Sequence, residues 1–434
     1  MFISFIKKSQ LYFIISFLVM IAAGTVLLKL PLIRSNGTPL EWIDALFVAT
    51  SSICITGLLP LPLSSLNLPG QLLVLALIQL GGIGIMTLTT SVILMMGRQL
   101  SFGNTLLMSN ISDRFVLRGT ENLTRTVIRY ALICEGIGFV LLLPSFWFGG
   151  DHSFLESFYL ALYHAIAGFC NAGMSPLDGS LAGVPAVVKM VVALLIICGG
   201  LGVYAIYDLQ GAYLYRRRLR AQTRLILAAT AILLIGGMGL LWLLQYQCGN
   251  PISWVDAFFQ SATARSCGYT AVPLETLSDG SLALLMVLML IGGAPGSTAG
   301  GMKVTTVALA VTAIYNTFKG NNRVLLFHRE IPIFNVLKAF VLILTYVLLL
   351  AGGTIMLQAL TPCEGQWATF ETVSALATVG LEIPYTDPLT VSGKIFLIFY
   401  MFLGRVGLFT FFLFLLSREH QSSLVYPEER VIVN

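Results

Sequence analysis

At least eight predominantly apolar stretches run through this chain of 434 residues, and a helix of about 20 such residues spans the hydrocarbon core of a bilayer. Only 10% of the residues are charged and 57% are hydrophobic, whereas about 25% of the residues in a soluble domain are charged. The first stretch, residues 13–30, lacks the small-residue cleavage site of a secretory signal. The sequence therefore predicts an all-α membrane protein whose first span is retained.

The loops between these stretches alternate in the sign of their charge. Lys7, Lys8 and the loops 98–129, 216–224 and 319–338 are rich in lysine and arginine, and the intervening loops are acidic. Lysine and arginine concentrate on the cytoplasmic side of membrane proteins. This pattern predicts a multi-pass protein of the cytoplasmic (inner) membrane with both termini in the cytoplasm. Topology and contact with membrane lipid account for the basic loops, so no nucleic-acid partner is predicted.

Each of the four acidic outer loops contains an apolar segment of about 10 to 14 residues, too short to span a bilayer but suited to a re-entrant pore helix. When the segments are aligned on a glycine, an aromatic residue stands ten positions before it and a small residue six positions before it in every copy. The four aligned segments are Phe47–Gly57, Tyr163–Gly173, Phe258–Gly268 and Phe370–Gly380.

A second glycine motif follows each loop, inside the next apolar span. The offsets from the loop glycine to this motif are 24, 26, 24 and 24 residues. The motifs are Gly81–Gly84, Gly199–Gly202, Gly292–Pro295 and Gly404–Gly407. Close helix packing alone would explain glycines in the spans, but it leaves the matched loops unexplained. The loop glycine and the span motif recur at a nearly constant spacing, which predicts four parallel repeats of a helix, pore loop, helix unit.

The four predicted repeats cover residues 1–100, 101–218, 219–325 and 326–434, the last with the C-terminal tail. Together they predict eight transmembrane helices and four re-entrant pore helices around one pseudo-fourfold pore. Irregular backbone at membrane depth is tolerated where it lines a water-filled cavity, and carbonyl oxygens there can replace the hydration shell of a cation. The predicted filter residues, which are also the only expected metal-binding positions, are Cys54, Ile55, Thr56, Gly57, Cys170, Asn171, Ala172, Gly173, Arg265, Ser266, Cys267, Gly268, Ala377, Thr378, Val379 and Gly380.

These loops resemble those of a known family. The stretches SSICITGL, AGFCNAGM, RSCGYTA and ALATVGLE are similar to the four filter loops of the Trk/Ktr/HKT superfamily of potassium transporters, and the likeness covers nearly the whole chain. With eight spans, the chain most resembles the Ktr-type membrane subunits. Cys170, Cys267 and Glu382 depart from the usual residues of that family. Serine in place of the first filter glycine favours sodium in the family, so Gly57 favours potassium.

The resemblance also implies how such a chain works and assembles. It implies potassium uptake by a homodimer of membrane subunits, each with its own pore. It further implies a cytosolic ring of nucleotide-binding regulatory subunits, with no cofactor in this chain itself. Potassium is then the substrate. Whether transport is channel-like or coupled to sodium is left open at this point.

The third inner span is interrupted in its middle. It runs for 38 residues, from Ser281 to Phe318, although about 20 suffice to cross the membrane. By resemblance the segment 292–303 is an intramembrane gating loop, and a static kink is the alternative. The predicted gate residues are Gly292, Gly293, Pro295, Gly296, Ser297, Thr298, Gly300, Gly301, Lys303 and, from the fourth repeat, Arg405.

Arg405 occupies the position that glycine fills in the other three repeats. An arginine at membrane depth costs about 2.5 kcal/mol or more on insertion scales, so a function is expected for it. Its charge would oppose a cation below the filter, and its side chain could bind the carbonyls of the loop. The alternative is a structural pair with Glu135 or Asp208. No specific role is predicted for Glu135 or Glu382.

Three other functions compete with potassium uptake. A sodium-selective pore would have the same architecture. A coupled secondary transporter of another solute would need a midplane cavity with convergent polar groups, and the spans offer few. A membrane enzyme is not predicted, because the four histidines and seven cysteines have no metal-ligand spacing and no nucleophile stands near a base in any recognisable pattern.

Overall fold

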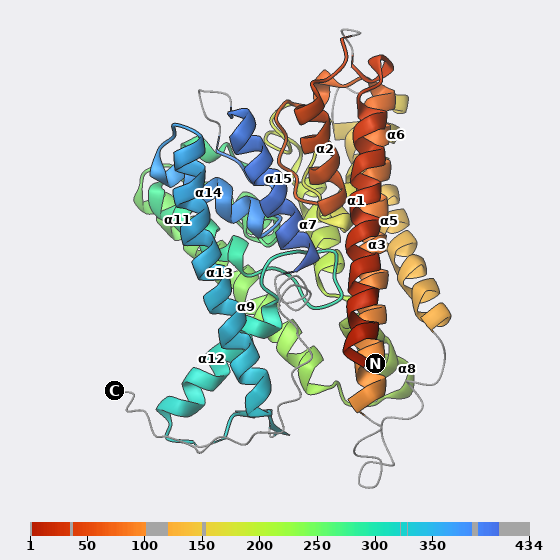
Figure 1. The fold of residues 1–434 in the computed structure, drawn as a ribbon. Helices are drawn as coiled ribbons and strands as arrows, with labels where there is room; N and C mark the ends of the chain where they lie inside the picture. Colours follow the sequence, from red (N-terminus) through yellow and green to blue (C-terminus); the bar gives the residue numbers. More distant parts are fainter. Residues whose placement is uncertain are drawn as a thin grey trace.

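The computed structural model describes residues 2–34, 38–100, 120–149, 153–321, 323–327, 329–383 and 389–407. Most of the basic loop 98–129 and the whole C-terminal tail therefore lie outside the described residues. The described chain is mostly helical (Figure 1). Its single small sheet is a hairpin in which β1 (Leu325–Leu326) pairs with β2 (Arg329–Glu330) in antiparallel register.

Three classes of helix build the fold. The continuous outer and inner helices are α1 (Phe2–Leu28), α3 (Leu68–Leu100), α5 (Thr120–Gly149), α9 (Ala221–Gln247), α13 (Ile333–Leu360) and α15 (Val391–Val406). The short helices that precede the loop glycines are α2 (Trp42–Cys54), α6 (Phe154–Cys170), α10 (Trp254–Thr263) and α14 (Gly365–Leu376). Two further spans are broken into the pairs α7 (Ala186–Gly200) with α8 (Val203–Tyr215), and α11 (Asp279–Leu290) with α12 (Val304–Phe318). Short 3₁₀ turns occupy Pro31–Ile33, Leu63–Ser65 and Leu274–Thr276.

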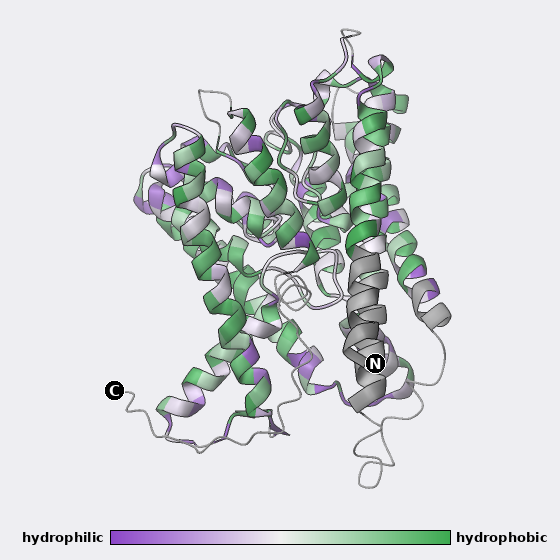
Figure 2. Ribbon diagram, in the orientation of Figure 1, coloured by the Kyte–Doolittle hydropathy of each residue, from purple (hydrophilic) through white to green (hydrophobic). Residues whose placement is uncertain are grey.

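Several helices are built to face lipid. Within the described residues, Arg125–Gly149, α9 and α13 are long and apolar enough to cross a membrane, and α7 with α8 could form a fourth, bent span. Only 17% of the most apolar 18-residue stretch of α13 is buried in the protein. Many of the exposed side chains of this helix are large and hydrophobic. Hydrophobic residues cover α9 and α13 along most of their length (Figure 2). The chain is therefore a multi-pass membrane protein, and the full set of eight spans stays a prediction.

The short helices begin and end in a defined way. Ser153 caps α6 in a capping box with Glu156, and Ser253 caps α10 by accepting the N–H of Asp256. Such caps satisfy the free N–H groups of a first turn. The last residues of α2 and α6 are Cys54 and Cys170, so these two predicted filter residues still belong to helices.

The helices pack in an order that closes on itself. Each short helix packs on the long helix that precedes it in the chain: α2 on α1, α6 on α5, α10 on α9 and α14 on α13. It also packs on the inner helix of the preceding unit, with α3 on α6, α7 on α10, α11 on α14 and α15 on α2. The contact between α15 and α2 joins the end of the chain to its beginning. The four short helices are thus arranged around a common centre.

Two inner spans are broken, although the sequence predicted a gating loop only in the third repeat. The axes of α7 and α8 differ by 95°, and Gly202 between them has a φ of 77°. The N–H of Ala294 donates to the Gly200 carbonyl at 2.8 Å, and the N–H of Val203 donates to the Gly296 carbonyl at 3.2 Å. The break in the second repeat therefore lies against the loop of the third and shares its backbone hydrogen bonds.

Candidate functional site

The backbone after each short helix follows the same course in all four copies. The residue two positions before the loop glycine has a positive φ: Ile55 (53°), Asn171 (61°), Ser266 (92°) and Thr378 (49°). The glycines themselves also have a positive φ: Gly57 (103°), Gly173 (63°), Gly268 (95°) and Gly380 (90°). Positive φ is uncommon for residues with a side chain, so this shared geometry is a structural counterpart of the aligned sequences.

The four loop glycines form a closed ring. An added Cβ would lie 2.7 Å from the Ala172 carbonyl oxygen at Gly57, 2.0 Å from that of Cys267 at Gly173, 2.2 Å from that of Val379 at Gly268 and 2.1 Å from that of Thr56 at Gly380. In each case the carbonyl belongs to the residue before the glycine of the next copy. Only glycine fits at such distances, and the last contact returns to the first copy.

Serines stabilise two of these loops in an equivalent way. The hydroxyl of Ser51 accepts the N–H of Gly57 at 3.1 Å, and that of Ser374 accepts the N–H of Gly380 at 3.0 Å. Both serines stand six positions before their glycine, where the sequence showed only a preference for small residues. The spacing was visible in the sequence, but the hydrogen bond was not.

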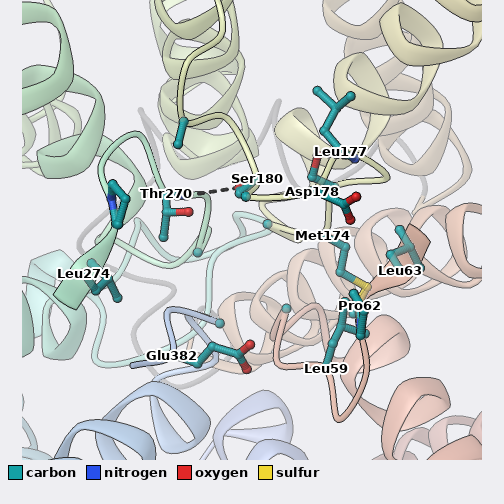
Figure 3. Close-up of a pocket in the computed structure, with 18 of the residues that line it drawn as sticks. Leu59, Pro62, Leu63, Met174, Leu177, Asp178, Ser180, Thr270, Leu274 and Glu382 are labelled. Carbon is teal, nitrogen blue, oxygen red and sulfur yellow. Dashed lines mark hydrogen bonds between the residues drawn. The ribbon is translucent and has the colours of Figure 1, made fainter. Parts of the chain in front are cut away.

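A cavity of about 490 Å³ opens on one side of the ring, and all four loop glycines line it. Glu382, Asp178 and Glu275 also line it, and Figure 3 shows Glu382 and Asp178 on opposite sides of the cavity. Asp178 accepts a hydrogen bond from the hydroxyl of Ser64 at 2.6 Å. Glu382 is exposed in the cavity, where the surrounding protein limits its hydration and raises the pKa of its carboxyl group to about 7. The cavity is thus acidic and meets the ring directly.

On the other side of the ring, the span glycines seat the inner helices against the short helices. An added Cβ would lie 2.2 Å from the Ile53 carbonyl oxygen at Gly81, 2.0 Å from that of Phe169 at Gly199 and 2.0 Å from that of Leu376 at Gly404. These carbonyls all lie four residues before a loop glycine. The third copy differs, because a Cβ on Gly292 would instead lie 2.0 Å from the carbonyl oxygen of Gly300.

Residues 292–303 form a closed loop between α11 and α12. The N–H of Gly292 donates to the Met302 carbonyl at 2.9 Å, and the N–H of Met302 donates to the Leu290 carbonyl at 3.2 Å. Gly296 and Gly301 adopt positive φ values of 75° and 67° within the loop. Lys303 at its end is held by its own backbone, since its ammonium group donates to the Ala299 carbonyl at 2.6 Å.

Side chains of the ring segments bind this loop. The hydroxyl of Ser266 accepts the N–H of Gly300 at 2.7 Å and donates to the Thr378 carbonyl at 3.2 Å. The side-chain amide of Asn171 donates to the Thr298 hydroxyl at 2.6 Å. The loop therefore lies directly below the ring and is hydrogen-bonded to it.

Two buried guanidinium groups also contact the loop. Arg405 is 5% exposed and donates to the Thr298 carbonyl at 2.5 Å and to the Gly81 carbonyl at 3.3 Å. Arg265, which was predicted as part of the filter, is 8% exposed and donates to the Gly292 carbonyl at 3.4 Å. Both side chains therefore hold backbone of the third repeat in place.

The alternative pairing of Arg405 with Glu135 or Asp208 is wrong. Asp208 forms an ion pair with Arg217 at 3.3 Å and accepts the N–H of Arg220 at 2.9 Å. Glu135 accepts hydrogen bonds from Gln79. Sequence spacing could not exclude these two pairings, because Arg405 lies far along the chain from both Glu135 and Asp208. In the part of the chain that the structure describes, no group of three or more His, Cys, Asp or Glu side chains could hold a metal ion.

Comparisons with known proteins identify relatives along nearly the whole chain. The family model TrkH, described as cation transport protein, matches residues 7–246 and 227–424. The potassium/sodium uptake protein NtpJ of Enterococcus hirae is 33% identical, with 96% of this chain and 95% of that protein covered. The Ktr system potassium uptake protein B of Vibrio alginolyticus is 33% identical over 96% of this chain and 93% of that protein. The protein of the same name from Bacillus subtilis is 30% identical over 96% of this chain and 95% of that protein.

A solved structure shares the fold. The potassium transporter TrkH from Vibrio parahaemolyticus superposes with a TM-score of 0.74, covering 95% of this chain and 85% of that chain at 19% sequence identity. At this identity the likeness concerns the fold.

Proposed function

The chain belongs to the TrkH family of cation transport proteins, and from that premise we propose that it takes up potassium across the cytoplasmic membrane. It is a transporter and not an enzyme. Relatives at 30–33% identity over nearly their full length are named potassium or potassium/sodium uptake proteins. The path that we propose runs through a filter of backbone carbonyls at the centre of four parallel repeats.

The observation that carries this proposal is the closed ring of loop glycines. Each glycine abuts the carbonyl of the next copy, and the ring opens onto an acidic cavity. Carbonyl oxygens can replace the water shell of a dehydrated cation, and the acidic cavity would concentrate cations at its mouth. We assign the filter to residues 55–57, 171–173, 266–268 and 378–380. Cys54, Cys170 and Ala377 precede it, and Arg265 supports the loop below.

We further propose that the loop 292–303 is the gate and that Arg405 holds it closed. The guanidinium group places a positive charge below the filter and binds the Thr298 carbonyl. Both effects oppose the passage of a cation. The charge repels the cation, and the hydrogen bond keeps the loop in the path that the cation would take. Arg405→Ala should therefore raise potassium flux in proteoliposomes, while flux equal to the wild type at matched protein content would refute this role.

Sodium is a second ion to consider, because the Enterococcus hirae relative is named a potassium/sodium uptake protein. The first loop of this chain has glycine at position 57, which favours potassium by family resemblance. Potassium is then the main substrate, and coupling to sodium is the alternative to simple conduction. Potassium uptake measured with and without external sodium distinguishes coupling from simple conduction.

Assembly follows from the same relatives. Two of those reported above are named proteins of a Ktr system, a name that implies more than one component. We propose a homodimer of this chain with a cytosolic nucleotide-binding regulatory subunit, docked on the basic cytoplasmic loops. No cofactor is proposed for the chain itself.

Growth of a potassium-uptake-deficient bacterium at low external potassium tests the main proposal. Expression of this chain, with or without a regulatory partner, should restore growth. The control is growth at high potassium, where all strains should grow equally. A chain that reaches the membrane but restores growth under neither condition would contradict potassium uptake.

A further inference from the structure

A buried carboxyl group lies behind the second filter segment and takes no part in the proposed path or gate. Glu135 is in α5 and is only 6% exposed. Both of its carboxyl oxygens lie 3.0 Å from Nε2 of Gln79 on α3, which donates to them. Within the described chain, its hydrogen-bond partner is this amide and not a cationic side chain. An ionisable group at membrane depth is costly and suggests a function.

The contact continues from Gln79 to the filter. The thiol of Cys170 donates to Oε1 of the same Gln79 amide at 3.3 Å. Cys170 is the last residue of α6, directly before the filter segment 171–173. The three side chains therefore form a relay of hydrogen bonds. It runs from α5 through α3 to the end of α6, directly before the second filter segment.

The two hydrogen-bond partners of Gln79 fix the orientation of its side-chain amide. Nε2 of Gln79 lies 3.0 Å from both oxygens of Glu135, so the amide turns its NH₂ group toward the carboxyl group, whose oxygens accept. Its carbonyl oxygen then faces Cys170, where it can accept the thiol proton. If the amide were reversed, its NH₂ group would face a sulfur atom that is a weak acceptor, and its oxygen would face the carboxylate.

The position of Cys170 is constrained from the other side as well. An added Cβ on Gly82 would lie 2.6 Å from the Cys170 sulfur, so the thiol fills the space that this glycine leaves open. The next residue, Asn171, has a positive φ of 61° and donates to the Thr298 hydroxyl of the loop. A shift of Cys170 would therefore reach both the filter backbone and the loop.

We propose that Glu135 is a positioning residue for ion selection: through Gln79 it holds Cys170 and thereby the backbone of the second filter segment, 171–173. This inference rests on the proposed function. Glu135 does not touch the ion in this role. It acts by fixing one orientation of an amide, and the filter then keeps the carbonyl positions that distinguish potassium from the smaller sodium ion.

The ratio of potassium to sodium uptake by proteoliposomes tests the relay. In Glu135→Gln the new amide can donate or accept, so both orientations of Gln79 become available. The ratio should fall roughly three- to tenfold, the size expected for one hydrogen bond. Gln79→Met, which removes the relay from a different helix, should lower the ratio to a similar extent and guards against a folding defect at position 135.

A double-mutant comparison separates the relay from other effects of the charge. Cys170→Ala should lower the ratio, and adding Glu135→Gln to it should cause no further loss, because both act through one contact. Ser145→Ala is the matched control, since Ser145 is a polar residue of α5 that donates to the Leu141 carbonyl away from the relay. Its ratio should equal that of the wild type.

Three results would overturn the relay: additive losses in the double variant, an unchanged ratio in Glu135→Gln, or an unchanged ratio in Gln79→Met. Failure of the proposed function would look different. The wild-type chain itself would then transport no potassium, and adding potassium would not raise its thermal stability in detergent. In that case the inference falls with the function on which it rests.

Discussion

Glycine at the ring is required by two independent constraints. Gly268 has a φ of 95°, and an added Cβ would lie 2.2 Å from the carbonyl oxygen of Val379. A side chain there would be strained by its backbone angles and would also displace the neighbouring segment. The alignment of the four loop glycines in the sequence is thus the consequence of one shared contact.

Gly268→Ala should therefore abolish potassium uptake. The matched control is Gly136→Ala in α5, where an added Cβ meets nothing within 4 Å and alanine favours the helix. Uptake by membrane vesicles, normalised to protein content, measures both variants. Equal uptake in the two would mean that the ring does not line the path.

Glu382 should make uptake depend on external pH. Its carboxyl group has a pKa raised to about 7 because the protein around the cavity limits its hydration, so it is charged above that pH and becomes neutral below it. The neutral group no longer attracts cations to the cavity, and the apparent affinity for potassium should weaken as the pH falls from 8 to 6.

The Glu382→Gln variant provides the comparison. It should show a weak apparent affinity at every pH, similar to that of the wild type at low pH. The concentration of potassium that gives half-maximal uptake is the measurement. A variant with the same pH profile as the wild type would assign the dependence to another group.

At the scale of elements, two ion pairs join inner helices to the first turn of a short helix in the next unit. Lys189 of α7 binds Asp256 of α10 at 2.6 Å, and Lys394 of α15 binds Asp44 of α2 at 2.6 Å. The second pair connects the last described helix to the first short helix. It therefore closes the ring of helices with a charged contact.

Lys394→Ala and Asp44→Asn should each lower the apparent melting temperature of the purified protein in detergent, because each leaves a partly buried charge without its partner. The double variant should lose less than the sum of the two single losses, because they share one interaction. Strictly additive losses would show that the pair does not couple α15 to α2.

The broken spans show the limits of prediction at this scale. The break between α11 and α12 was predictable, because proline and clustered glycines stand in an overlong apolar stretch. The break between α7 and α8 was not, because Gly199–Gly202 resembles Gly81–Gly84, which lies within the continuous helix α3. The difference arises from the neighbours, since the Gly200 carbonyl and the Val203 N–H bond to the loop of the third repeat.

For the whole molecule, the alternation of charge predicts sidedness that labelling can test. In a Cys248→Ser background, which removes an exposed native thiol, Glu275→Cys should react with a membrane-impermeant maleimide in intact cells. Arg218→Cys should react only after the cells are permeabilised. Labelling of both positions in intact cells, or of Arg218→Cys alone, would contradict the predicted topology.

The sequence by itself determined the class of protein, the four matched segments and the place of the third break, because apolar length, charge alternation and glycine spacing are local or periodic properties. Only the tertiary structure decided which groups meet: Ser266 with Gly300, Arg405 with Thr298, and Glu135 with Gln79. Arg405 and Thr298, like Glu135 and Gln79, come from different repeats, whereas Ser266 and Gly300 are 34 residues apart in the third repeat, and folding brings each pair together. Hydrogen bonds depend on distances of a few ångströms that spacing along a chain does not specify.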